Sequence, residues 1–410
     1  MPQLFTVVSP QEAWSRLEPH LSPIERVEVV PTSEALGRVL ADDTLAPVDL
    51  PHFPRSAMDG YAVRAEDTHG ASESQPAYLN VVGEILMGKP AGVTLAPGEA
   101  ALIHTGGMLA NESNAVVMVE NTREVDASTI EVVRPAAKGE NVIQVGEDMA
   151  RGEALLSRGS LLRPQDIGAL LALGITEVSV FQRVKVALIP TGDELVEPGD
   201  RPGPGQIRNT NAYALAGLAV QAGAIPLRLG IVRDSYESLK EAAHWAMKEA
   251  DIVVVSAGSS VSTRDITASV INLLGKPGVL VHGISLRPGK PTILGLVDRK
   301  PFFGLPGNPA SAMITFEIFV TPAIYRLSGC NQLPKRCEIR ARLTRNVPSV
   351  PGREDYIPVK IEERNGELYA EPVFGKSNLM FALVKADGIA RIPIDKGGLV
   401  AGETAMIRMF

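Results

Sequence analysis

The sequence predicts a multidomain protein in which a doubly wound α/β domain is combined with two β-rich domains. Its 410 residues exceed what a single hydrophobic core usually organises, so several domains are expected. Residues 183–327 alternate apolar strand-like runs with helix-like segments, a pattern typical of βαβ units around a parallel sheet. Residues 47–141 and 329–410 instead carry short runs of β-forming residues between glycine, proline and polar turns.

The first part of the chain is expected to contain helices on either side of an inserted β domain. Ser9 can cap a helix whose first position is Pro10, and Glu12 is placed to complete a capping box. A second helix is expected over residues 32–39. A third is expected over residues 164–173, where a following glycine would end it.

Strands and helices alternate regularly in the α/β region. Strands are predicted at residues 184–189, 225–232, 252–255, 279–284 and 302–303, with a hairpin-like strand at 292–297. Helices are predicted at residues 211–222, 234–250 and 264–274 and from residue 309 onward. Asp234 and Glu237 are expected to cap the second of these helices. Because such sheets bind ligands outside the carboxyl ends of their strands, the turns after these strands form the candidate site.

Composition and charge argue against several classes of protein. A formal net charge of −7 without a cluster of lysines and arginines disfavours nucleic-acid binding, which needs a basic face. No apolar run approaches the roughly 18 residues of a membrane-spanning helix, and no signal peptide is apparent. The two cysteines, Cys330 and Cys337, suit neither a disulfide framework nor a zinc site. We therefore expect a cytoplasmic protein with no nucleic-acid partner and no membrane partner.

Two turns carry groups suited to binding an anion. In residues 304–312 (GLPGNPASA), glycines allow close backbone approach and Pro309 suits the first position of a helix, whose free N–H groups attract an oxyanion. In residues 287–291 (RPGKP), Arg287 and Lys290 stand between prolines and can clamp a tetrahedral dianion. Each turn also has a plainer interpretation, a packing turn for the first and a solvated basic turn for the second.

Carboxylates follow neighbouring strands of the same sheet. Glu194 and Asp265 are placed to share a hard cation such as Mg²⁺, which prefers oxygen ligands. Asp234 fits the cap of a helix at least as well as a site residue. Asp59 and Asp148 lie in glycine-flanked turns, where aspartate is usually only a turn former. The residues alone leave these alternatives open.

Several motifs together resemble those of one enzyme family. They are SAMDGYAV at residues 56–63, Thr105-Gly106 followed by VVMVE at 116–120, GED at 146–148, TGDEL at 191–195, RPGKP at 287–291 and GLPGNPASA at 304–312. In this order, over nearly the whole chain, they resemble the molybdopterin molybdenumtransferases, the family of the MoeA proteins and the E domain of gephyrin.

The resemblance implies an elongated homodimer of four-domain subunits. Domain I would comprise residues 27–46 and 144–178, the inserted β domain II residues 47–143, the MogA-like molybdopterin-binding domain III residues 1–26 and 179–327, and the C-terminal β domain IV residues 328–410. The implied enzyme takes adenylylated molybdopterin and molybdate, cleaves the adenylate in a Mg²⁺-dependent step and releases AMP and molybdenum cofactor. The implied partners are these substrates and the molybdopterin adenylyltransferase.

Matching positions also imply roles for individual residues. Those needed for catalysis would be Asp59, Thr105, Asp148, Glu194, Asp234 and Asp265, and of these Glu194 and Asp265 would hold the Mg²⁺ ion. Those that bind the substrates would be Ser256, Gly258, Ser259, Arg287, Lys290, Pro291, Pro306, Pro309, Ser311, Arg353 and Ser377. Since Arg353 and Ser377 belong to the last domain, they are expected to reach the site only across a domain or subunit boundary.

Two other functions stand as alternatives. Ala257 and Ser262 replace glycines in the loop of residues 256–262, and a side chain there costs about 1 kcal/mol if the backbone needs a positive φ. These two replacements are the basis for the hypothesis that the chain is a weakened paralogue, which binds molybdopterin or serves as a scaffold without turnover. A dinucleotide enzyme is the third hypothesis, although no Gly-x-Gly-x-x-Gly turn follows the first strand of the α/β region.

Overall fold

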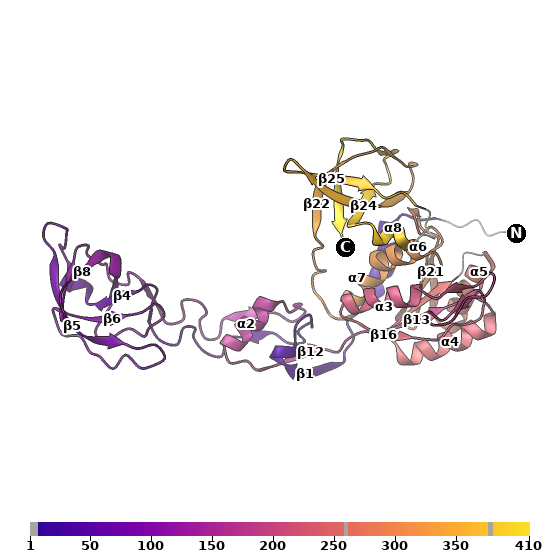
Figure 1. Cartoon of the computed structure of the whole chain (residues 1–410). Coiled ribbons are helices and arrows are strands. Elements are labelled where there is room, and N and C mark those ends of the chain that lie inside the picture. Colours follow the sequence, from indigo (N-terminus) through magenta and orange to yellow (C-terminus); the bar gives the residue numbers. More distant parts are fainter. Residues whose placement is uncertain (1–6, 258–260, 376–379) are drawn as a thin grey trace. The chain divides into compact units, whose positions relative to one another are not determined.

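The computed structural model describes residues 7–257, 261–375 and 380–410 of the chain (Figure 1). It forms two compact units. The first comprises Met1–Ala41, Arg158–Arg163 and Glu177–Phe410, and the second comprises Asp42–Ser157 and Pro164–Thr176. The four-domain division implied by the resemblance is finer than this one and stays a prediction.

The second unit is built around the expected inserted β domain. Its main sheet has the strand order β7-β4-β6-β5-β9-β8. These strands are β4 (Gly60–Val63), β5 (Ala77–Ile85), β6 (Glu99–Ile103), β7 (Ala115–Met118), β8 (Thr122–Asp126) and β9 (Thr129–Val132). Alternate side chains of β4 enter different cores, with Tyr61 in one and Ala62 in the other. Gly60 leaves no room for a side chain, because a Cβ there would lie 2.0 Å from the Val117 carbonyl oxygen.

Short ladders and a helix complete the second unit. β2 (Thr44–Leu45) pairs with β11 (Ala154–Leu156), and β3 (Arg55–Ser56) pairs with β10 (Val142–Ile143). Single 3₁₀ turns lie at Ala65–Thr68 and Val119–Asn121. The helix α2 (Pro164–Ala172) confirms the helix expected over residues 164–173.

The first unit contains the α/β domain, whose sheet has the order β16-β13-β17-β21-β20-β18. Its strands are β13 (Lys185–Pro190), β16 (Ile225–Arg228), β17 (Ile252–Ala257), β18 (Pro277–His282), β20 (Ile293–Val297) and β21 (Lys300–Pro306). The first four strands in the order run parallel, as expected. β20 is antiparallel to both of its neighbours, so the sheet is mixed at this edge. The reason is a tight hairpin with β21, at which Asp298 and Arg299 both adopt positive φ.

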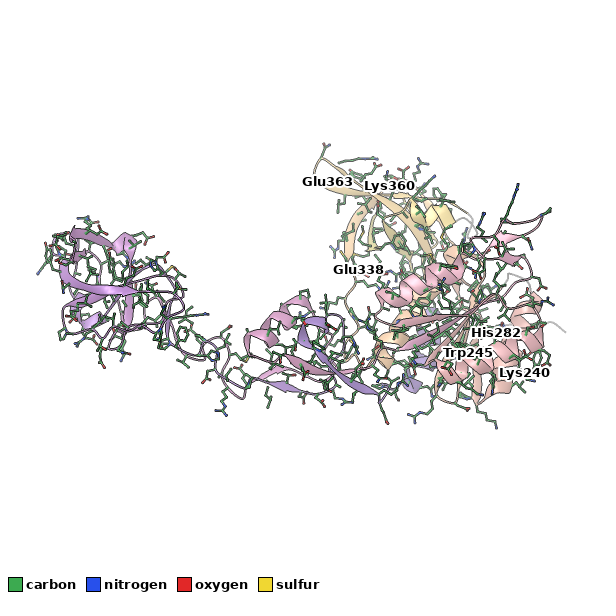
Figure 2. All side chains as sticks on the ribbon, turned by 60° about the horizontal axis from the view of Figure 1, so that its bottom comes forward. Lys240, Trp245, His282, Glu338, Lys360 and Glu363 are labelled. Atoms are coloured by element: carbon green, nitrogen blue, oxygen red, sulfur yellow. The ribbon has the colours of Figure 1, made fainter. Side chains whose placement is uncertain are left out.

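Helices cover both faces of this sheet, which confirms the doubly wound arrangement. α1 (Pro10–Leu17), α3 (Asn211–Gln221), α6 (Pro309–Thr315) and α7 (Thr321–Leu327) contribute to one core, and α4 (Tyr236–Glu249) and α5 (Val261–Leu274) contribute to the other. The π-helical segment Phe316–Val320 joins α6 to α7. In β17, Val254 enters the first core and Val253 the second. Lys240 and Trp245 lie on α4, and Trp245 is exposed to solvent (Figure 2).

The expectation of a helix over residues 32–39 is wrong. Only Thr32–Glu34 is helical, as a single 3₁₀ turn, and a separate turn follows at Leu36 and Gly37. The chain is held extended farther on, because Val39 and Leu40 form β-bridges with Leu161 and Val180. This segment follows β1 (Val27–Pro31), which pairs with β12 (Glu177–Phe181). Helix propensity is therefore overridden here by pairing between distant segments.

Serine residues cap the N-termini of two helices, α1 and α4. The Ser9 hydroxyl accepts a hydrogen bond from the Glu12 amide at 3.1 Å, which confirms the expected N-terminal cap of α1. The cap of α4 is Ser235, whose hydroxyl accepts from the Ser238 amide at 3.2 Å. The expectation that Asp234 caps this helix is wrong. Its carboxylate is therefore free of that structural role.

The C-terminal β domain belongs to the first unit. Its sheet has the order β19-β24-β25-β22-β28-β26. The elements are β19 (Leu286–Arg287), β22 (Glu338–Leu343), β23 (Val347–Pro348), β24 (Glu354–Arg364), β25 (Glu367–Pro372), α8 (Met380–Val384), β26 (Gly388–Ile392), β27 (Gly398–Leu399) and β28 (Thr404–Met409). Lys360 and Glu363 lie on the part of β24 that pairs with β25 (Figure 2). Because β19 comes from the α/β domain, its pairing with β24 joins the two domains.

The two residues that replace loop glycines occupy regular structure. Ala257 is the last residue of β17 and pairs with Pro306 of β21. Ser262 lies within α5, whose backbone is right-handed. Neither position therefore requires a positive φ, and the expected strain does not arise. Across the described residues, the helices fall short of the length and apolar character needed to cross a membrane.

Candidate functional site

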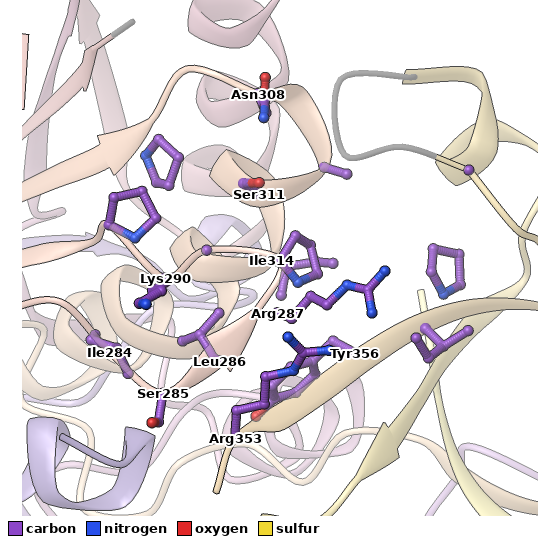
Figure 3. Close-up of a pocket in the computed structure, with 18 of the residues that line it drawn as sticks. Ile284, Ser285, Leu286, Arg287, Lys290, Asn308, Ser311, Ile314, Arg353 and Tyr356 are labelled. Atoms are coloured by element: carbon purple, nitrogen blue, oxygen red, sulfur yellow. The ribbon is translucent and has the colours of Figure 1, made fainter. Parts of the chain in front are cut away.

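A pocket of about 760 Å³ lies at the carboxyl ends of the α/β sheet, between this domain and the C-terminal β domain. Of the residues predicted to bind substrate, those that line it are Arg287, Lys290, Pro291, Pro306, Ser311 and Arg353. Figure 3 shows Arg287 and Lys290, which belong to one loop, and Arg353, which comes from the C-terminal β domain. Three cationic side chains therefore face one cavity, which is the arrangement predicted for binding an oxyanion.

The loop that carries Arg287 and Lys290 is fixed by its own hydrogen bonds. The Ile284 amide donates to the Lys290 carbonyl oxygen at 2.8 Å, and the Thr292 hydroxyl donates to the Gly289 carbonyl oxygen at 2.7 Å. Gly289 has a φ of +122°, which favours glycine. The turn thus orders the backbone while the side chains of Arg287 and Lys290 stay exposed. No ion pair of the described residues involves Lys290.

The turn from β21 into α6 forms another wall of the pocket. The side-chain amide of Asn211 donates to the Gly307 carbonyl oxygen at 2.6 Å and so holds the turn against α3. Pro309 occupies the first helical position, as expected, but does not line the pocket. Ser311 is only 3% exposed and lies in the first turn of the helix. The first amides of a helix have no partner within the helix, and Asn308, Ala310 and Ser311 of this turn line the pocket.

Arg353 reaches this pocket within one chain. β24 pairs in parallel with β19, and the Ser285 hydroxyl donates to the Gly352 carbonyl oxygen at 2.8 Å. The predicted route across a domain boundary is therefore present without a second subunit. Ser377, which was predicted beside it, lies outside the described residues, as do Gly258 and Ser259.

Sequence analysis missed Asp355, which organises the cationic wall. This carboxylate is fully buried, and it accepts from Arg353 Nε at 2.8 Å and from Arg353 Nη2 at 3.2 Å. Arg287 Nη1 lies 3.6 Å from the same carboxylate. The signal available in the sequence was the spacing of Arg353, just before β24, and Asp355 on it, since side chains two apart in an extended chain face the same side.

Two of the predicted acidic residues of the α/β domain, Glu194 and Asp234, lie near each other on turns that follow strands of the sheet. Asp193 Oδ1 accepts from the Asp234 amide at 3.4 Å. Burial is the main cause that raises the pKa of Asp234 above its ordinary value, and the carboxylates of Glu194 and Asp193 add to it. Within the described part of the chain, Asp234 Oδ1 is buried and has no close hydrogen-bond partner, and the nearby Thr191 hydroxyl offsets part of the rise in the pKa. Such a buried oxygen beside like charges would gain from a cation.

The two residues predicted to hold Mg²⁺ lie on different elements. Glu194 lies on a turn near Asp234, and Asp265 lies on α5. Asp265 is exposed on α5, and its carbonyl oxygen accepts from the Ser269 hydroxyl. Ser256 is buried at the end of β17, where its carbonyl oxygen accepts from the Thr191 amide at 3.0 Å. Among the described residues, no group of three or more His, Cys, Asp or Glu side chains lies together so as to hold a metal by itself. Mg²⁺ usually takes only one or two carboxylates and completes its shell with water and phosphate oxygens.

The other predicted catalytic residues lie in the second unit. Asp59 Oδ1 accepts from the Thr105 amide at 2.7 Å and from the Thr105 hydroxyl at 3.2 Å. The hydrogen bond from this amide is the main cause that lowers the pKa of Asp59 below its ordinary value. His104, to which sequence analysis gave no role, lies with Nδ1 3.9 Å from Asp59 Oδ1 and with Nε2 2.9 Å from Glu84 Oε1.

Asp148 occupies a separate loop of the same unit. Its amide donates to the Leu50 carbonyl oxygen at 3.0 Å. The motifs SAMDGYAV and Thr105-Gly106 thus meet in one cluster, whereas the GED motif contributes a different turn.

Comparison with known families covers most of the chain. The MoeA N-terminal region (domain I and II) matches residues 8–174, a probable molybdopterin binding domain matches residues 187–326, and the MoeA C-terminal region (domain IV) matches residues 340–408.

Curated relatives match over nearly their whole length. A putative molybdopterin biosynthesis protein of Methanocaldococcus jannaschii is 36% identical over 399 residues, which cover 95% of this chain and 94% of that protein. A molybdopterin molybdenumtransferase of Haemophilus influenzae is 33% identical over 402 residues, with 97% and 98% covered. The crystal structure of a molybdopterin biosynthesis MoeA protein from Pyrococcus horikoshii OT3 superposes with a TM-score of 0.84 at 34% identity, covering 99% of this chain and 100% of that one. With its motifs, its fold and its full-length relatives in agreement, this chain belongs to the MoeA family.

Proposed function

We propose that this chain is a molybdopterin molybdenumtransferase that joins molybdenum from molybdate to molybdopterin supplied as its adenylate. The observation that carries the proposal is the pocket in which Arg287, Lys290 and Arg353 face one cavity, in a chain whose curated relatives bear this enzyme's name. A guanidinium group donates two parallel hydrogen bonds to an oxyanion, and an ammonium group adds a point charge. Such donors suit the tetrahedral dianion molybdate.

Cleavage of the adenylate would take place at the carboxylates. In this proposal Glu194 and Asp265 would hold Mg²⁺ together with Asp234, because Glu194 and Asp234 lie on neighbouring turns and Asp234 presents a buried oxygen without a close hydrogen-bond partner among the described residues. When bound, the ion would neutralise charge on the phosphate oxygens. Ser256 and the adjoining loop would bind the pterin substrate. The products would be AMP and molybdenum cofactor.

The second unit and the partners are further parts of the proposal. We propose that Asp59, Thr105 and Asp148 contribute to catalysis, as the resemblance implies, and that the active form is a cytoplasmic homodimer. The molybdopterin adenylyltransferase is the expected source of the adenylate. Light scattering of the purified protein would measure its mass directly, and a monomeric mass would contradict the dimer.

The enzyme hypothesis is tested by following AMP. The purified protein is incubated with adenylylated molybdopterin and molybdate, with and without Mg²⁺, and the product is assayed by reconstitution of a molybdenum enzyme. We expect AMP and active cofactor only with the metal. Lys290→Ala should slow the reaction, whereas the matched control Lys360→Ala should not, because Lys360 lies on β24 outside the pocket. Binding of the pterin adenylate without AMP release under any metal condition would instead support the binding or scaffold protein.

A further inference from the structure

The cationic wall of the pocket contains a carboxylate that no substrate would contact directly. Asp355 is the second residue of β24, and its side chain is 0% exposed. It accepts two hydrogen bonds from the guanidinium group of Arg353, at 2.8 and 3.2 Å, in the parallel arrangement that fixes the plane of that group. Arg287 Nη1 lies 3.6 Å from the same carboxylate. Both arginines of the pocket therefore share one buried counterion.

The backbone places this carboxylate where segments from two domains meet. Arg287 and Asp355 are paired in the parallel ladder of β19 and β24. The Glu354 amide donates to the Ser285 carbonyl oxygen at 2.9 Å, next to the Ser285–Gly352 hydrogen bond. Among the ion pairs of the described residues, Arg287 and Arg353 have no carboxylate partner other than Asp355. The carboxylate of Asp355 is therefore the group that fixes the two guanidinium groups relative to each other.

Arginine has enough donors to serve Asp355 and a ligand together. A guanidinium group carries five N–H donors in a rigid plane, and Arg353 uses two of its nitrogen atoms for Asp355. The side chains of Arg353 and Arg287 are 32% and 60% exposed, so part of each group stays open toward the cavity (Figure 3). A carboxylate behind them fixes the angle at which the remaining donors face a ligand.

We propose that Asp355 is a positioning residue, which holds Arg287 and Arg353 at the spacing and orientation that bind a tetrahedral dianion. This inference rests on the proposed function, because it assumes that the pocket binds molybdate. The inference predicts that loss of Asp355 weakens binding of the dianion, whereas net charge alone predicts that it strengthens binding. Arg287, Lys290 and Arg353 with Asp355 leave two net positive charges, and loss of the carboxylate raises this to three. On charge alone, a dianion would then bind more tightly.

The test is direct binding of molybdate, and of sulfate as a second tetrahedral dianion, measured by isothermal titration calorimetry on the full chain. Asp355→Asn keeps the shape of the side chain but presents an amide N–H to the guanidinium group and breaks the paired hydrogen bonds. We expect its dissociation constant for molybdate to rise about tenfold or more, the effect of losing a well-oriented charged hydrogen bond. Arg353→Lys, which keeps the charge and loses the fork, should weaken binding in the same way.

The same strand supplies a matched control. Glu354 is 4% exposed and accepts two hydrogen bonds from Arg391, at 2.8 and 2.7 Å, but it does not line the pocket. Glu354→Gln should lower the melting temperature about as much as Asp355→Asn while leaving the molybdate affinity unchanged. A merely structural role of Asp355 predicts that the two variants behave alike in both measurements.

The outcomes separate this inference from the proposed function. If the wild-type protein binds molybdate and Asp355→Asn binds it equally well or more tightly, the positioning role is wrong and the enzyme hypothesis remains. If Asp355→Asn does not fold, Arg353→Lys decides, and unaltered affinity of that variant also overturns the inference. Wild-type protein that binds neither dianion contradicts the proposed oxyanion pocket itself.

Discussion

The loop that presents Arg287 and Lys290 should not tolerate a side chain at Gly289. In the change Gly289→Ala, the new Cβ would lie 2.4 Å from Thr315 Cγ2 and 2.5 Å from Leu286 Cδ1. Both neighbours are buried, at 0% and 1% exposure, so neither has solvent into which to move. Overpacking of this kind costs about 1–3 kcal/mol. The backbone φ of +122° adds about 1 kcal/mol for a residue with a Cβ.

The expected loss of stability is therefore about 2–4 kcal/mol, or about 4–16 °C in the melting temperature of this unit. Gly205→Ala is the matched control, because Gly205 has a φ of +81° but a Cβ added there would meet no atom within 4 Å. Gly205→Ala should lower the melting temperature only by the effect of the positive φ, about 2–4 °C. Differential scanning fluorimetry measures both variants. Equal shifts for the two would refute the packing argument, and an unchanged molybdate affinity of Gly289→Ala would show that the loop does not position its cations.

Three further predictions concern charged groups. Thr105→Val should raise the pKa of Asp59 part of the way to its ordinary value, because the hydroxyl is lost and the amide hydrogen bond is kept; a carboxyl NMR titration that shows no change would contradict this. In the wild type, the stabilising effect of ionised Asp59 is present above about pH 4 and is lost as the pH falls through the lowered pKa. Asp234→Asn should raise the melting temperature at neutral pH by about 1–3 °C, since burial raises the pKa of Asp234 and its neutral form is favoured in the fold. This gain should disappear below about pH 4, where the wild-type carboxyl is also protonated, and a gain that persists there would point to another cause. Glu317→Gln should destabilise the first unit by about 3 kcal/mol in urea unfolding, because Glu317 is 11% exposed and pairs both with Arg408, which is 18% exposed, and with Arg336; a loss below about 1 kcal/mol would mean that water or another carboxylate replaces it.

Regular elements of the α/β domain were predictable because each has a clear local pattern. The helix expected over residues 211–222 is α3 (Asn211–Gln221), and the strand expected over residues 184–189 is β13 (Lys185–Pro190). Residues 32–39 have a comparable helical preference, yet most of them are not helical. Their conformation depends on bridges to segments more than a hundred residues away, which local propensity does not report.

The candidate site was predictable to the extent that it resides in short turns. Arg287 and Lys290 occupy one loop, and the structure places both in the pocket with Ser311. The spacing of Arg353 and Asp355 was a signal for their pairing, but the burial of Asp355 was not predictable, because an aspartate between a glutamate and a tyrosine on a strand is normally exposed. Its burial follows from the pairing of β24 with β19, which belongs to another domain.

The amino-acid sequence by itself determined which turns carry cations and which carry carboxylates, and it determined the family through motifs distributed over the whole chain. Those properties depend on residue type and short spacing. Only the tertiary structure decided that Arg353 joins Arg287 within one subunit, around a carboxylate that both share. The physical reason is that this arrangement depends on a hydrogen bond between Ser285 and Gly352, 67 residues apart, whose contact is set by the packing of two domains.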